Sequence, residues 1–320
     1  MDLIYTDSDL NDVGVLQGYT IDLAFGKDEN DFSLSVTTDG AKLSAKNYIY
    51  FEGTEYGGVI DNLKVDTAKN SVTYSGRTWQ GILNSKVICP PSGQAYRIAS
   101  GDANEVLETL INHLGLEGLF QASVASSGFS LSNYSFDRYI QGYNGIAKML
   151  KSVGARLEVN FLNGKVVLSA VAIKDYTTNE EFDSSQIDFS IETNQSPVNH
   201  LICLGSGELA DRQVYHVYVD EFGNISDTQH YTGLEEVVEV YDYPNAESLD
   251  ELKNSGKERL QELSANGTIK LSLDAKQNYA VGDIVGGREN ITKIAVKQAI
   301  TKKIVTIKKG ILSIQYEVGD

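Results

Sequence analysis

Proline, cysteine and tryptophan are scarce in this chain. Its 320 residues include 4 prolines, 2 cysteines and 1 tryptophan, beside 29 glycines. So few prolines argue against flexible proline-rich linkers. Cys89 and Cys203 do not have the spacing of a metal or redox motif, and lone cysteines in a large cytosolic chain are more often buried thiols than a disulfide. We therefore predict two free, buried thiols.

Long apolar runs are missing too. No stretch approaches the roughly 18 apolar residues that a membrane-spanning helix needs. The first residues, Met1–Asp9, contain neither the basic segment nor the apolar segment of a signal peptide. We therefore expect a protein that is made in a cytoplasm, without a signal peptide and without membrane insertion.

Histidine, a common metal ligand and general base, occurs only four times, as His113, His200, His216 and His230. These residues form no H-E-x-x-H, no H-x-H and no Cys–His pair, so their spacing does not support a zinc site or a catalytic triad. His200 and His216 flank apolar strand residues, which indicates packing positions. Gly205–Gly207 lacks the context of a phosphate-binding loop or a nucleophile elbow, and predicts a tight turn.

The acidic segment Asp7–Asp12 begins like a calcium-binding loop but does not continue as one. Asp12 occupies the sixth position, where the loop needs glycine to bend, and Gly18 occupies the twelfth, where it needs a bidentate glutamate. We interpret this segment as a solvated loop. The sequence as a whole therefore predicts no catalytic residue, no metal site and no cofactor, and we expect the protein not to be an enzyme.

A carbohydrate-directed protein is the main alternative. Glu235, Glu236 and Glu239 cluster, and a glycosidase needs two carboxylates about 5–10 Å apart across a cleft. Trp79, with Tyr74 nearby, offers a ring on which a sugar can stack, although a lone tryptophan at a strand-to-helix junction is more often a core anchor. A carbohydrate-binding module or a glycan-cleaving enzyme on a β-rich scaffold therefore stays open as an alternative.

Acidic residues outnumber basic ones. The 44 aspartates and glutamates against 27 lysines and arginines give a formal net charge of −17, which argues against a duplex-binding surface. Between Asn290 and Tyr316, in contrast, six lysines occur without an acid, Lys302 and Lys303 among them. This segment predicts either a basic strand pair with solvated ends or a basic edge that docks on an acidic neighbour.

The hydrophobic pattern is mainly that of β-strands. Phe32–Val36 alternates as a half-buried strand does, and the runs Val59–Val65 and Ser71–Tyr74 flank a turn at Thr67–Asn70. Gly76–Leu83 then predicts one or two helical turns. Residues 1–94 together with 195–240 are predicted to form a first β-barrel-like domain.

In the middle of the chain the hydrophobic period changes to that of a helix. Asp102 is a good N-cap for a helix that closes at Gly115, and a second helix is predicted over Gly142–Gly154. Asn163-Gly164 then lies between two apolar strands, which is the strongest short hairpin signal. Residues 95–194 therefore predict an inserted α+β domain.

A third helix and further strands end the chain. Ser248 with Glu251 caps this helix, and five short strands with glycine turns follow between Thr268 and Tyr316. Residues 241–320 are predicted to form this helix and a second β-barrel-like domain. The predicted fold class is therefore mainly β, with two small barrels and the inserted α+β domain.

Several segments, in order along the chain, resemble one protein family. They are Phe51–Asp61, Tyr74–Leu83, Val198–Ile225, Tyr279–Val285 and Lys302–Lys308. Their combination resembles the tail-hub, or baseplate-hub, proteins of siphophages and of prophages of Gram-positive bacteria, which are related to the central hub proteins of contractile tails. The resemblance runs from one end of the chain to the other but rests on no chemical motif.

The resemblance implies a structural part of the virion tail. Such hubs carry two similar β-barrels per chain, and three chains form a ring that joins a sixfold tail tube to a threefold spike or fibre. The implied partners are further copies in a homotrimer, a tail-tube or distal tail protein, and a tail-tip spike or fibre protein. Tape measure and DNA would pass without specific binding, which an acidic interior favours. A hub of the same fold in a non-phage injection machine is a further alternative.

The resemblance also implies where the ring contacts lie. We expect them at the edges of both barrels and at the lysine-bearing strand. The candidate interface residues are Gly53, Tyr56, Gly58, Tyr279, Asp283, Arg288, Lys302 and Lys303. The chain ends at Asp320, without the long C-terminal extension of some tail-tip proteins, so we expect receptor binding or wall digestion to belong to another chain.

Overall fold

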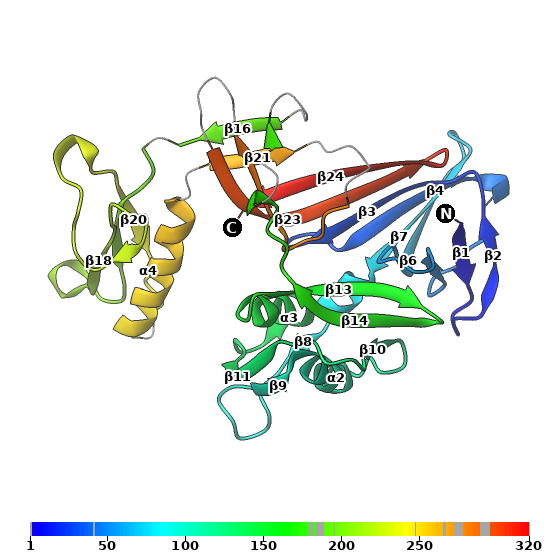
Figure 1. Ribbon diagram of the computed structural model, residues 1–320, viewed down its shortest axis with the longest axis horizontal. Helices are drawn as coiled ribbons and strands as arrows, with labels where there is room; N and C mark the ends of the chain where they lie inside the picture. The colour runs from blue at the N-terminus through cyan, green and yellow to red at the C-terminus, as the bar shows by residue number, and fades with distance from the viewer. Residues whose placement is uncertain are drawn as a thin grey trace. The chain divides into compact units, whose positions relative to one another are not determined.

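The computed structural model describes residues 2–40, 42–178, 182–183, 189–194, 196–246, 248–264, 267–271, 278–288 and 295–319. Contacts divide the chain into two compact units (Figure 1). The first is Met1–Phe189 with Lys270–Gly319, and the second is Ser190–Ile269. Strands make up most of the regular structure, which confirms the prediction of a mainly β chain. No helix in the described ranges is long and apolar enough to cross a membrane.

One large antiparallel sheet organises the first unit. Its strands follow the order β24-β23-β3-β4-β7-β6-β5-β1-β2. Their bounds are β1 (Leu3–Thr6), β2 (Asp12–Leu16), β3 (Thr20–Gly26), β4 (Asp31–Thr37), β5 (Tyr48–Tyr50), β6 (Gly57–Asp66), β7 (Ser71–Thr78), β23 (Ala295–Lys308) and β24 (Ile311–Gly319). Shorter elements of the first unit are η1 (Thr38–Gly40), η2 (Tyr176–Thr178), β15 (Phe182–Asp183) and β22 (Ile284–Arg288). The division between the two units falls within β16 (Phe189–Thr193) and β21 (Gly267–Leu271).

Alternating apolar residues explain the strands at the centre of this sheet. Phe32, Leu34 and Val36 of β4 are buried on one face, as the period of two along a strand requires. β6 and β7 form a hairpin in which Asp66 pairs with Ser71, around the turn that the sequence predicts. The predicted strands in this part of the chain are therefore confirmed.

The two predicted closed barrels are not observed. Within the described ranges the strands pair along an open path, and no barrel closes there. The reason lies in β23, which is one long strand where the sequence predicted two. Its second half pairs with β3, from Lys302 opposite Gly26 to Lys308 opposite Thr20. The C-terminal strands therefore extend the N-terminal sheet. Two predicted C-terminal strands, Thr268–Leu273 and Ile291–Val296, lie partly outside the described residues, at residues 272–273 and 291–294.

The central segment forms helices and small sheets. These elements are α1 (Trp79–Asn84), β8 (Val87–Ile88), β9 (Ile98–Asp102), α2 (Ala103–Leu114), β10 (Phe120–Ala122), β11 (Ser130–Ser135), β12 (Ile140–Gln141), α3 (Gly142–Lys151), β13 (Ala155–Leu162) and β14 (Lys165–Ala172). The Asp102 carboxylate accepts from the backbone N–H of Asn104, and Gly115 ends α2 at φ 67°, as predicted. β13 and β14 form the predicted hairpin, with Leu162 opposite Lys165.

The central elements share a hydrophobic core with the N-terminal sheet. Trp79 of α1 stacks on Phe161 of β13 with ring centroids 5.3 Å apart, and Tyr50 of β5 lies 4.1 Å from the same ring. Leu107 of α2 and Ile146 of α3 belong to this cluster as well. Residues 95–194 therefore contain the predicted helices and hairpin, but they do not have a separate core of their own.

The second unit is a sheet covered by a helix. Its elements are β17 (His200–Leu204), η3 (Leu209–Asp211), β18 (Val214–Val219), β19 (Ile225–Ser226), η4 (Gly233–Glu235), β20 (Val238–Asp242) and α4 (Leu249–Leu263). The four strands follow the order β19-β18-β17-β20. Leu252 and Leu260 of α4 pack on Leu201, Cys203 and Val217. The Ser248 side chain caps α4 by accepting from the N–H of Glu251, as predicted.

These units differ from the predicted domain division. Residues 195–240 lie in the second unit, whereas the prediction joined them to residues 1–94. Residues 270–319 lie in the first unit because β23 pairs with β3. Both cysteines are free, and Cys203 is buried as predicted, while Cys89 is only half-buried.

Candidate functional site

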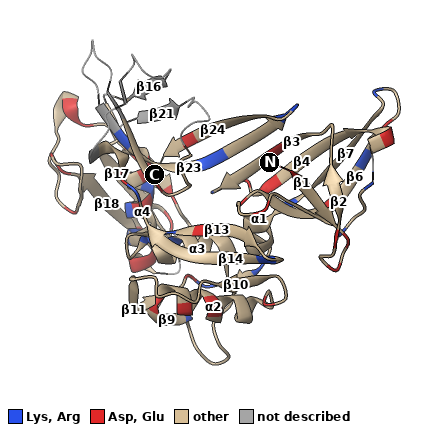
Figure 2. Ribbon diagram, turned by 45° about the vertical axis from the view of Figure 1, so that its right-hand side comes forward, with Lys and Arg blue, Asp and Glu red and all other residues tan. Residues whose placement is uncertain are grey.

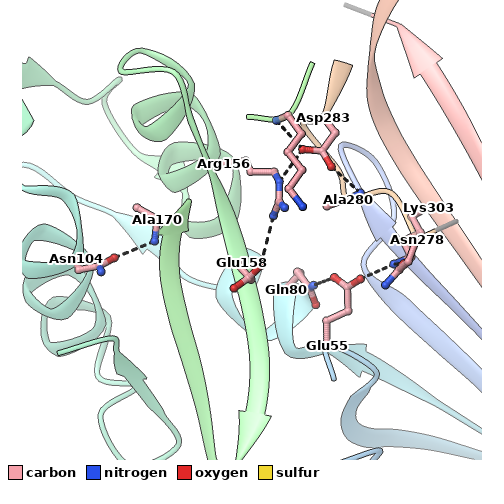
Figure 3. Close-up of polar contacts among 11 residues, drawn as sticks. Glu55, Gln80, Asn104, Arg156, Glu158, Ala170, Asn278, Ala280, Asp283 and Lys303 are labelled. Atoms are coloured by element: carbon pink, nitrogen blue, oxygen red, sulfur yellow. Dashed lines mark hydrogen bonds and ion pairs between the residues drawn. The ribbon is translucent and has the colours of Figure 1, made fainter. Parts of the chain in front are cut away.

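A polar region of the first unit surrounds a cavity of about 360 Å³. It is lined by segments that are far apart in the sequence (Figure 3). Glu55 and Tyr56 come from the loop between β5 and β6, and Gln80 comes from the first turn of α1. Arg156 comes from β13, and Lys303 comes from β23. We call these five residues, with Asn278 and Asp283, the interior polar cluster.

Lys303 is the centre of this cluster. Only 1% of it is exposed, and its Nζ lies 2.8 Å from Oε1 of Glu55 and 2.6 Å from Oδ1 of Asn278. Burial alone would lower the pKa of Lys303, but the Glu55 carboxylate more than offsets this and the pKa is raised overall. Gln80 donates to the second oxygen of Glu55 at 3.2 Å. Lys303 is therefore charged, and it is held by one carboxylate.

A second ion pair joins β13 to the segment before β22. Nε of Arg156 donates to Oδ1 of Asp283 at 2.8 Å, and both side chains are buried. The backbone N–H groups of Lys174 and Ala280 donate to the same carboxylate at 3.1 Å each. Three donors thus satisfy the hydrogen-bonding capacity of this buried carboxylate. This pair fixes the C-terminal segment onto the central hairpin.

The interior polar cluster has the properties of a site that stabilises the fold. Its cations and carboxylates are paired with one another, which offsets the cost of removing charge from water. Among the described residues, no group of three or more histidines, cysteines, aspartates or glutamates is placed to hold a metal ion. The cluster joins β13, β23 and the β5–β6 loop.

The structure brings several predicted interface residues together, but inside the unit. Tyr56, Tyr279, Asp283 and Lys303 are all buried, whereas Gly53 lines the cavity but is itself exposed. A side chain that is buried within its own chain does not contact a neighbouring copy. The four buried residues support the fold of the unit, and the predicted interface role of Gly53 stays a prediction.

The remaining predicted interface residues lie at the sheet. Gly58 is buried in β6 opposite Thr78 of β7. Arg288 ends β22, opposite Ala295. Lys302 forms ion pairs with Glu29 at 2.7 Å and with Glu317 at 3.8 Å. The predicted role of these three as an interface between copies stays a prediction.

Sequence reasoning missed the partners that matter most in the cluster. Glu55, Gln80, Asn278 and Arg156 were not singled out, because each stands in an ordinary loop, helix or strand context. One signal was present for Lys303. It shares the alternating face of Val305 and Ile307, and all three are buried.

Two residues of the carbohydrate alternative, Trp79 and Glu236, are engaged in other contacts. Trp79 is fully buried in the core, so its ring is not available to a sugar. Glu236 lies in the second unit, where Oε1 accepts from Nδ1 of His200 at 2.6 Å and from Nε2 of Gln229 at 2.8 Å. The tryptophan is a core anchor, as the sequence favoured.

His200 and His216 are linked to each other in the second unit. Nε2 of His200 lies 2.8 Å from Nδ1 of His216, and the His200 ring packs on Tyr218 with centroids 4.5 Å apart. The Glu236 carboxylate accepts from Nδ1 of His200, so the two nitrogens of this ring contact Glu236 on one side and His216 on the other. The chain Glu236–His200–His216 was not predicted, because its members are far apart in the sequence.

This arrangement predicts how His216 titrates. Burial lowers the pKa of His216, and so does the nearby His200. The stability that neutral His216 contributes is present above the ordinary histidine pKa and is lost as the pH falls through the folded value. In an NMR titration we expect His216 to titrate below the ordinary pKa, and we expect His200→Asn to bring it closer to that value. A His216 that titrates at or above the ordinary value would contradict this.

Comparison of sequences identifies no relatives. No protein-family model matches the chain, and no curated protein matches it.

Comparison of structures finds tail proteins that are similar to almost the whole chain, among them three from different bacteria. The first is the tail protein from Neisseria meningitidis MC58, with 12% identity and a TM-score of 0.55 over 100% of this chain and 96% of that chain. The second is the 43 kDa tail protein of prophage MuSo2 from Shewanella oneidensis, with 11% identity and a TM-score of 0.59 over 100% and 98%. The third is prophage tail protein gp18 from Listeria monocytogenes EGD-e, with 15% identity and a TM-score of 0.51 over 99% and 94%.

These similarities concern the fold, because the sequences are far too different to carry residue roles across. They come from three different bacteria, so the shared fold does not restrict the host to the Gram-positive group named in the sequence analysis. The match spans both compact units of this chain and nearly all of each neighbour. The fold of this chain is that of phage and prophage tail proteins.

Proposed function

We propose that this chain is a structural hub of a phage or prophage tail, which joins the tail tube to the tail tip. The observation that carries the proposal is the match in fold, from end to end, with tail proteins from three bacteria. In such a role the chain contributes shape and contacts and performs no reaction. Its place is the assembled virion tail.

The interior of the first unit supports a mechanical role. Two ion pairs connect the C-terminal part of the first unit to earlier segments: Lys303–Glu55 joins β23 to the β5–β6 loop, and Arg156–Asp283 joins the segment before β22 to the central hairpin. Pairs of this kind fix one arrangement of segments, because each charge is costly to separate from its partner. A joint between a tube and a tip has to transmit force without rearranging, and this construction suits it.

The proposed assembly is a ring of three copies. A ring needs a head-to-tail contact that closes, so that two different surfaces of each copy meet. The partners are then a tail-tube or distal tail protein on one side and a spike or fibre protein on the other. Figure 2 shows acidic residues on many of the loops, and the net charge is −17, so DNA would pass without being held.

Native mass spectrometry over a range of protein concentrations in low salt tests this proposal. We expect a species of three times 35.0 kDa whose share rises with concentration, as mass action requires. The same samples mixed with the tail-tube protein from the same virion should give a larger complex. A protein that stays monomeric at every concentration and does not bind the tube protein would refute the hub proposal.

A further inference from the structure

The second unit has a mainly polar groove, with exposed apolar side chains and exposed glutamates among its lining residues. Its volume is about 650 Å³, within the range of ordinary binding pockets. The lining comes from Ser196–Asn199, from the turn between β18 and β19, and from the segment around η4. Phe222 is 79% exposed and Leu234 is fully exposed. Large apolar side chains held in water beside a groove are typical of an interaction site.

The rim of the groove carries negative charge without compensation. Glu221 and Glu235 line it, both are exposed, and neither has an ion-pair partner among the described residues. Asp220 has a different task, because its carboxylate accepts from the N–H groups of Phe222 and Asn224 and thereby fixes the turn. No lysine or arginine is among the described lining residues. An occupant of this groove is therefore expected to be apolar and basic.

The chain itself carries a surface of that kind, at the turn between β23 and β24. Lys309 at φ 51° and Gly310 at φ 75° form a tight two-residue turn between the paired residues Lys308 and Ile311. Ile311 is 73% exposed. We call Lys308–Ile311 the hairpin tip. Figure 2 shows the end of this hairpin in blue.

The hairpin tip differs from the rest of the basic strand. Lys302 and Lys303 are paired with carboxylates of their own unit. Lys308 and Lys309, in contrast, are exposed and have no ion-pair partner among the described residues. Their charge is thus available for a contact outside the first unit.

We propose that the hairpin tip of one copy inserts into the acidic groove of the next copy. The inference rests on the proposed ring, since it assigns the two different surfaces that a closing head-to-tail contact needs. Ile311 would bury its side chain against Phe222 and Leu234, while Lys308 and Lys309 face Glu221 and Glu235. Apolar burial then supplies most of the affinity, and the rim charges set orientation and salt dependence.

Charge reversal tests the contact. We expect K308E/K309E and E221K/E235K each to raise the apparent dissociation constant of the oligomer by about tenfold or more in native mass spectrometry. Combining all four substitutions in one chain should restore association, because both surfaces are then exchanged. The matched control is Lys69→Glu, at the exposed turn between β6 and β7, which should leave association unchanged.

Disulfide trapping tests whether the contact is between copies. In a Cys89→Ser background, a protein with Lys308→Cys is mixed with a protein with Glu221→Cys and oxidised. Each chain then has one accessible thiol, so a cross-linked dimer of unlike chains reports only a contact between copies. Lys69→Cys replaces Lys308→Cys in the control, and we expect little cross-linking from it.

The failure of this inference can be distinguished from the failure of the proposed function. A trimer that forms equally well with K308E/K309E, and that gives no more cross-linking with Lys308→Cys than with Lys69→Cys, would overturn the assigned contact and leave the hub standing. A chain that is monomeric in every measurement would overturn both.

Discussion

Replacing Glu55 with glutamine is expected to lower the free energy of unfolding by about 3–5 kcal/mol. The change keeps the size of the side chain and removes the only carboxylate within ion-pair distance of Lys303 in the described structure. Lys303 is buried, so water cannot solvate its charged ammonium group in place of Glu55. An unpaired charge in such a place is among the few single changes with an effect of this size.

Two further variants separate the charge from the shape of the side chains. Glu55→Gln with Lys303→Met removes both charges, and we expect it to recover most of the lost stability. Lys302→Met is the matched control, since Lys302 is the neighbouring residue and its partner Glu29 is exposed, so a loss below about 1 kcal/mol is expected. Urea denaturation of the four proteins measures this. Equal losses for Glu55→Gln and Lys302→Met would refute the special role of Lys303.

Local sequence signals predicted the elements of this fold well. Asn163-Gly164 fixes the β13–β14 hairpin, because only a tight turn with positive φ at both residues joins these strands. The Ser248 cap and the Asp102 cap likewise depend on residues within one turn of the helix. Each of these signals is complete within a few residues, so it can be interpreted without knowing the rest of the chain.

Strand partners could not be predicted in the same way. β23 pairs with β3, which comes from the other end of the chain. No sequence feature of either strand identifies the other as its partner. Alternation shows which face of a strand is buried but not against which strand it lies. The sequence therefore suggested two separate barrels, whereas the pairing of β3 with β23 forms one extended sheet. The same limit hid the partner of Lys303, because Glu55 lies in a loop 248 positions away.

The candidate site shows why exposed and interior roles were confused. Six lysines without an acid predict a basic surface when they are counted along the sequence. In the structure the strand divides them, since Lys303 points into the interior and Lys308 and Lys309 end at an exposed turn. Only the second set has the exposure that a docking surface needs. Assigning each lysine to a face of the strand would have distinguished the interior lysine from the exposed ones.

Replacing Gly58 with alanine is expected to lower the free energy of unfolding by about 3 kcal/mol or more. A Cβ at this position would lie 2.1 Å from the carbonyl oxygen of Arg77 and 2.9 Å from Cα of Thr78. Both atoms belong to the backbone of β7, which is held by pairing with β4 as well as β6. The clash can therefore be relieved only by separating β6 from β7.

Gly118→Ala is the control for this substitution. A Cβ at Gly118 would meet no atom within 4 Å, so we expect a change in stability of less than about 0.5 kcal/mol. Thermal and urea unfolding of both variants, with circular dichroism to follow the strands, makes the comparison. A Gly58→Ala protein as stable as the Gly118→Ala protein would show that β6 and β7 can separate cheaply. If Gly58→Ala lowers the free energy of unfolding as expected, a defect in ring assembly in this variant is explained by the damaged sheet. Gly58 then affects assembly through the fold of its own chain.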